Sequence, residues 1–190
     1  MKILAVESSA VSASAAVCDN GRIISENYIN AGLTHSQTLM PMIDSALKNA
    51  EIPLESIDAF ACSVGPGSFT GIRIGVSLVK GMADPLNKKC VAVSTLEAIA
   101  KPLENTGVIA ASVMDARCNQ VYCALFDCEG AKMSRLTEDE AISVDELTER
   151  LKSQEKRVIL IGDGANVCYN KMNRTLETRG ELRENTIQGR

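Results

Sequence analysis

The most informative segment of the chain is Gly65-Pro66-Gly67-Ser68-Phe69-Thr70-Gly71-Ile72-Arg73-Ile74-Gly75, which links an apolar strand-like run to a long apolar helix-like run. Its glycines remove side chains that would block a close neighbour and allow positive φ, while Pro66 stiffens the turn. Ser68 or Thr70 is placed to cap the following helix, which leaves backbone N–H groups pointing outward at its start. Two interpretations are open: an anion site, or a tight turn whose glycines serve packing alone.

The segment does not match the two common phosphate-binding motifs. A dinucleotide fingerprint requires glycine where Thr70 stands, and a Walker loop requires Gly-Lys-Ser/Thr where Gly71-Ile72-Arg73 stands. The sequence therefore predicts no standard nucleotide cradle at this turn.

The composition predicts a globular, cytoplasmic protein that does not hold nucleic acid by itself. The chain has 190 residues, 45% of them hydrophobic, which suffices for a core in one or two domains. A net charge of −4 and an aromatic content of 3% argue against direct RNA binding, which depends on cations and base stacking. No run reaches the roughly 20 apolar residues that span a bilayer, and Glu7 comes too early for a signal peptide.

The cysteines predict free, mostly buried thiols. There are seven, an odd number, and several fall inside strand-like apolar runs. Cys118, Cys123 and Cys128 are spaced by five residues, which matches no familiar zinc motif, and His35 is the single histidine. We therefore expect no structural metal.

Hydrophobic periodicity predicts the same order of elements in both halves, strands first and then alternating helices and strands. In the first half we expect strands over 2–7, 12–18, 22–29, 57–64 and 90–93 and helices over 35–50, about 70–83 and 95–101. In the second half we expect strands near 107–114, 120–127, 132–138 and 158–161, with helices over about 144–152 and after Gly162-Asp163-Gly164-Ala165. This order predicts two α/β lobes of related plan, 1–102 and 103–190, the second one shortened and with a poorly ordered polar tail from about residue 171.

The predicted helix over 70–83 is apolar on nearly every side. Ile72, Val76 and Val79 form one stripe, and a second stripe consists of Gly71, Gly75, Leu78 and Met82. A helix on one face of a sheet needs one apolar stripe, so something else should cover the second. Either the other lobe of the chain or a partner subunit would serve, and Leu33 and Met40 would widen such a patch.

Several segments resemble the TsaB family, formerly called YeaZ. They span about residues 1–170 and are most specific in the first lobe: Ile3–Ser9, His35-Ser36 with Leu39 and Pro41, Gly65–Gly75, Lys80-Gly81, Val93–Glu97, Met114–Arg117 and Gly162–Gly164. The resemblance implies an actin-like ATPase (ASKHA) fold of two ribonuclease-H-like lobes. It also implies a role in forming N6-threonylcarbamoyladenosine at position 37 of tRNAs that read codons beginning with A.

In that family the chain would be a non-catalytic partner of the threonylcarbamoyl transferase TsaD, with weak or no ATPase activity. The resemblance implies a heterodimer with TsaD, a ternary complex with the ATPase TsaE, a homodimer, and contact with tRNA only through the complex. It implies no intrinsic cofactor, with ATP or ADP expected at the interface of the complex. TsaD-like proteins hold a metal with two histidines, and this chain has one.

The resemblance also assigns residues, none of them catalytic or metal-binding. For the partner interface it implies His35, Leu39, Met40, Ile43, Ser68, Thr70, Ile72, Arg73, Val76, Val79 and Lys80. For nucleotide or anion contacts it implies Ser8, Ser9, Gly67 and Ser68.

Three other interpretations stay open. In an actin-like ATPase or small-molecule kinase, Glu7 or Asp115 would hold magnesium or act as a base, with Gly162–Ala165 near the adenosine. A peptidase would need a metal site that His35 alone cannot build. A homodimer with a binding role outside tRNA modification would use the same apolar face.

Overall fold

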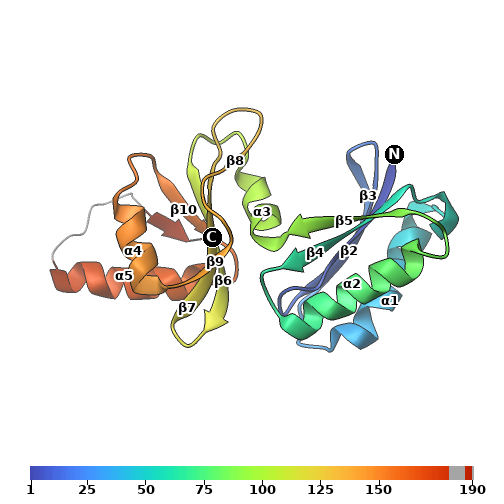
Figure 1. Cartoon of the computed structure of the whole chain (residues 1–190), viewed down its shortest axis with the longest axis horizontal. Helices are drawn as coiled ribbons and strands as arrows, with labels where there is room; N and C mark the ends of the chain where they lie inside the picture. Colours follow the sequence, from blue (N-terminus) through green and yellow to red (C-terminus); the bar gives the residue numbers. More distant parts are fainter. Residues whose placement is uncertain (180–186, 190) are drawn as a thin grey trace. The chain divides into compact units, whose positions relative to one another are not determined.

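The computed structural model describes residues 1–179 and 187–189 of the chain. It divides into two compact units, Met1–Thr95 and Leu96–Arg190, which we call the first and second lobes (Figure 1). The division falls at the start of a short helix, α3 (Thr95–Ala100), whereas the sequence placed it after that helix, at residue 102.

The first lobe is a five-stranded sheet with two helices. Its strands have the order β3-β2-β1-β4-β5, in which β1 is antiparallel to β2 and parallel to β4. All of the predicted elements are present, with ends that differ by one or two residues. They are β1 (Lys2–Glu7), β2 (Ala13–Asp19), β3 (Arg22–Ile29), α1 (His35–Ala50), β4 (Ala59–Gly65), α2 (Phe69–Ala83) and β5 (Lys89–Ser94), with a 3₁₀ turn at Leu54–Ser56.

The core of the first lobe lies between this sheet and the helices α1 and α2. Alternate residues of the strands, such as Leu4 and Val17, point into it because successive side chains of a strand face opposite sides. From the helices come Leu39, Ile43 and Val79, which are at most 1% exposed. The two helices contact one another, so their outer sides form one continuous surface.

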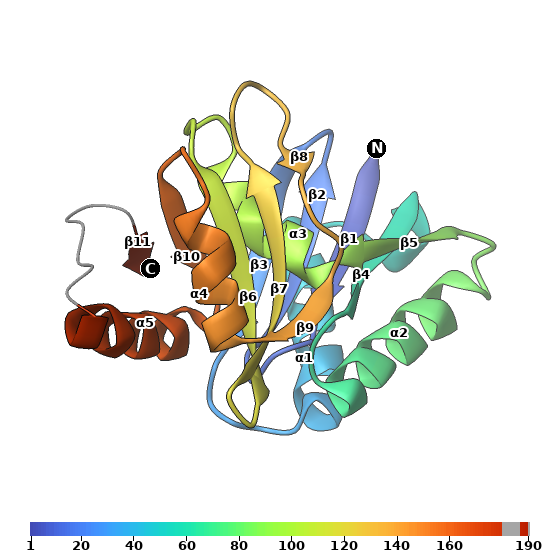
Figure 2. The same ribbon diagram turned by 60° about the vertical axis from the view of Figure 1, so that its left-hand side comes forward.

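The second lobe repeats the plan of the first. Its sheet has six strands, five of them in the order β11-β10-β6-β7-β8, and these five correspond in position to β5-β4-β1-β2-β3 of the first sheet; the sixth, β9, pairs with β7. The helices α4 and α5 contact each other and lie against this sheet (Figure 2). The elements after α3 are a 3₁₀ turn at Lys101–Leu103, β6 (Ile109–Arg117), β7 (Gln120–Asp127), β8 (Ser134–Arg135), β9 (Glu140–Ser143), α4 (Val144–Lys152), β10 (Val158–Ile161), α5 (Ala165–Arg179) and β11 (Ile187–Gly189).

The second lobe differs from its prediction mainly at the edges of its sheet. The strand expected over 132–138 is reduced to the two residues of β8, and β9 pairs with β7 where no strand was predicted. The edge strands β8 and β11 have two and three residues, against eight and six in β3 and β5. Residues 171–179 continue α5, whereas the sequence predicted a poorly ordered tail there; 180–186 and 190 lie outside the described residues.

All seven cysteines are free thiols, and four of them are buried. Cys123 and Cys168 lie in the core between the second sheet and its helices. Burial raises the pKa of the Cys123 thiol from 9.0 to about 12 and that of Cys168 to about 11. None of the helices within residues 1–179 is both long and apolar enough to cross a membrane.

The thiols should therefore fall into two reactivity classes. Iodoacetamide at pH 8 should alkylate the exposed Cys90 and Cys118 in the native protein and spare Cys123 and Cys168, because the thiolate is the reactive form. Mass spectrometry of peptides from native and urea-unfolded protein measures the difference. Equal labelling of Cys123 and Cys118 in the native protein would contradict the second-lobe core described above.

Candidate functional site

The turn after β1 packs closely against the starts of α1 and α2, and we call this contact the glycine junction. A methyl group added at Gly67 would lie 2.4 Å from the carbonyl oxygen of Ser9, and one added at Gly71 would lie 2.1 Å from that of Ser8. At Gly75 it would lie 2.3 Å from Ser8 Oγ. These three glycines recur every four residues, so they keep one side of the segment free of side chains where the turn approaches it.

Hydrogen bonds fix the same junction. The Ser8 hydroxyl donates to the Gly71 carbonyl at 2.9 Å, and the Ser68 N–H donates to the Ser9 carbonyl at 2.6 Å. Ser68 also caps α2, since its Oγ accepts from the Gly71 N–H at 3.2 Å, as one of the two predicted caps. At the start of α1, His35 Nε2 donates to the Ala10 carbonyl at 2.8 Å.

This arrangement favours packing over anion binding as the reason for the glycines. Ser8 and Ser9 are each 2% exposed, and the space beside Gly67 is filled by Ser9. The Ser9 hydroxyl has no hydrogen-bond partner among the described residues, but it is shielded from solvent. Ser8, Ser9, Gly67 and Ser68 therefore do not form an open cradle that fits a nucleotide phosphate.

The carboxylates of the kinase interpretation are held by neighbouring groups. Glu7 accepts hydrogen bonds from the Ser9 N–H and the Ser63 hydroxyl. Asp115 accepts from the Arg117 N–H at 2.8 Å. Within the described part of the chain, no three His, Cys, Asp or Glu side chains are grouped so as to hold a metal ion.

The glycine turn of the second lobe packs as the first one does. A methyl group at Gly162 would lie 2.2 Å from the Val113 carbonyl oxygen, and one at Gly164 would lie 2.9 Å from the Met114 carbonyl carbon. Loss of solvent and the nearby charge of Asp115 raise the pKa of Asp163. The turn thus brings α5 against the end of β6, and an adenosine contact is not needed to explain its glycines.

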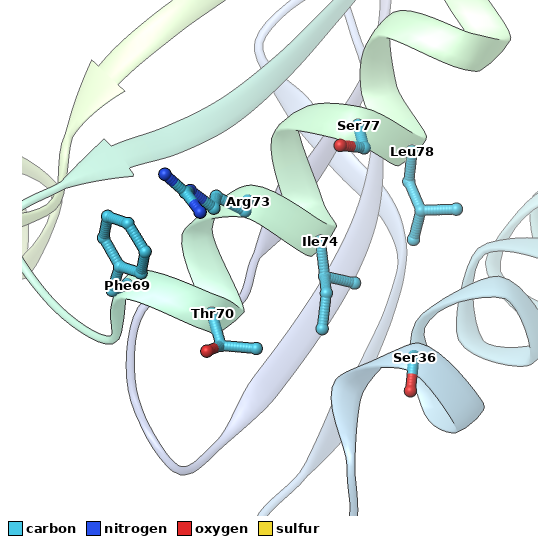
Figure 3. Close-up of a pocket in the computed structure, with 7 residues that line it drawn as sticks. All are labelled: Ser36, Phe69, Thr70, Arg73, Ile74, Ser77 and Leu78. Atoms are coloured by element: carbon cyan, nitrogen blue, oxygen red, sulfur yellow. The ribbon is translucent and has the colours of Figure 1, made fainter.

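An open groove runs along the outer side of α2 beside the start of α1. It has a volume of about 510 Å³ and is lined by Ser36, Phe69, Thr70, Arg73, Ile74, Ser77 and Leu78 (Figure 3). Phe69 is 66% exposed, and the Arg73 guanidinium lies over its ring, 3.6 Å from the ring centroid. We call these lining residues, together with Met40 and Lys80, the α1–α2 surface.

The structure places the predicted interface residues in three groups. Met40, Ser68, Thr70, Arg73 and Lys80 are exposed, while His35, Ile72 and Val76 are half-buried. The assignment of Leu39, Ile43 and Val79 to the interface is wrong, because these side chains fill the first-lobe core and cannot contact a partner.

The two apolar stripes predicted for α2 also need correction. The buried side of the helix consists of Gly71, Gly75, Val79 and Ala83. Ile72 and Val76 flank it on one edge and Ile74 and Leu78 on the other, all half-buried. The surplus apolar area is therefore two half-buried flanks and not a second full stripe.

Sequence reasoning missed the groove-lining residues Ser36, Phe69, Ile74 and Ser77. Phe69 is one of only three phenylalanines in the chain and lies one turn before Arg73. An aromatic residue and a cation one turn apart on an otherwise apolar helix form the pattern that could have predicted an exposed Phe69.

Comparison with known proteins places the chain in a family. A family model described as "TsaD: tRNA N6-adenosine threonylcarbamoyltransferase" matches residues 29–178. The tRNA threonylcarbamoyladenosine biosynthesis protein TsaB of Bacillus subtilis is 28% identical over 180 residues, which cover 95% of this chain and 79% of that protein. The chain belongs to the TsaD family, in its TsaB (YeaZ) group.

Solved structures agree with membership of the TsaB group. YeaZ from Pseudomonas aeruginosa superposes with a TM-score of 0.77 at 25% identity, over 99% of this chain and 84% of that one. ROK hexokinase from Thermus thermophilus superposes with a TM-score of 0.50 at 10% identity, over 100% of this chain and 92% of that one, and shows the fold alone. The predicted actin-like ATPase type of fold is thereby confirmed.

Alanine substitutions at glycines of α2 test how much the glycine junction contributes to stability. Gly71→Ala forces a methyl group against the Ser8 backbone and should lower the free energy of unfolding by about 2 kcal/mol. Gly81→Ala is the matched control in the same helix, because nothing lies within 4 Å of its added methyl group. That variant should be about 0.5–1 kcal/mol more stable than wild type.

Urea unfolding of both variants, followed by far-UV circular dichroism, measures this contrast. If Gly71→Ala were as stable as Gly81→Ala, the turn after β1 would not pack against α2 as closely as described.

Proposed function

We propose that the chain acts in the biosynthesis of threonylcarbamoyladenosine in tRNA as a non-catalytic subunit that binds and positions TsaD. The observation that carries this proposal is the α1–α2 surface, an exposed groove with an aromatic anchor in a chain of the TsaB group. Aromatic and arginine side chains at the centre of a surface are typical of residues that dominate binding energy.

In this proposal the two sides of α2 have different roles. Val79 and the glycines hold the helix on the sheet, while Phe69, Arg73 and Met40 present a surface to the partner. The half-buried Ile72 and Val76 would lose their remaining exposure in the complex. The core residue Ile43 supports the surface from beneath.

The proposal includes the rest of the assembly implied by the family. TsaE would join the TsaD heterodimer, tRNA would bind through the complex, and a homodimer would use the same α1–α2 surface. ATP or ADP would belong to the interface of the complex, since the serines and glycines of the turn after β1 form no open phosphate cradle in this chain. A non-catalytic role is supported by the relatives' description as a biosynthesis protein, in contrast to the transferase description of the family model.

The second candidate function, an actin-like ATPase or small-molecule kinase, has the fold in its favour. The carboxylates it would use, Glu7 and Asp115, accept hydrogen bonds from neighbouring backbone or hydroxyl groups. We rank it below the scaffold role because the similar proteins are described as tRNA threonylcarbamoyladenosine biosynthesis proteins.

Substitution of exposed apolar residues on the α1–α2 surface should distinguish the scaffold role from the kinase role. Phe69→Asp and Met40→Asp should each weaken the complex with the same organism's TsaD by at least about tenfold, because a carboxylate replaces an apolar contact. Tyr28→Asp is the control, since Tyr28 is 63% exposed on β3, outside the α1–α2 surface. Isothermal titration calorimetry of the three variants measures the affinities.

Two outcomes would overturn the proposal. One is a complex that all three variants form with wild-type affinity. The other is the absence of any complex while the isolated chain hydrolyses ATP, which would bring the kinase function forward.

A further inference from the structure

We draw no further inference here: the strongest candidate, the face of the first sheet opposite α1 and α2, where Ala5, Ala16 and Ala61 lie half-buried in one cross-strand row with the exposed Val91, carries nothing because nothing in the described part of the chain shows what covers it.

Discussion

The close approach of α2 to the turn after β1 is the constraint on which the first lobe depends. At Gly71 and Gly75 the helix comes so near to Ser8 that no side chain fits between them. The Ser8 hydroxyl and the Ser68 cap satisfy polar groups that this approach would otherwise bury without partners. His35 ties α1 to the same turn, so both helices are set relative to the sheet at one point.

From this constraint follows the division of α2 into an inner and an outer side. The inner side has little more than glycine, alanine and valine, because the sheet and the turn leave no room for larger groups. The apolar and charged groups of the helix are displaced to its flanks and its outer side, where Phe69 and Arg73 stack. A helix packed at an ordinary distance would bury its large side chains and present a polar exterior.

The sequence predicted the elements of the first lobe well because each has its own periodicity and ends at a turn. It could not predict β9, in which Ile142 is the sole buried apolar residue and whose pairing with β7 is long-range. Helical spacing showed that Leu39, Ile43 and Val79 share apolar faces, but spacing does not tell a core from a partner. The role of Gly71 stayed open for a similar reason, since its neighbour Ser8 lies 63 positions away in the chain.

The one-sided glycine packing of α2 has an evolutionary consequence. Substitutions on the inner side should lower the stability of the fold, while substitutions on the outer side should leave the fold intact and change only what that surface binds. Duplicated genes that keep the same inner side can therefore diverge in the subunit they recognise without passing through unfolded ancestors. The second lobe has a close turn of the same kind at Gly162 and Gly164, so in each lobe the packing at the turn can be kept while the exposed side of the helix differs.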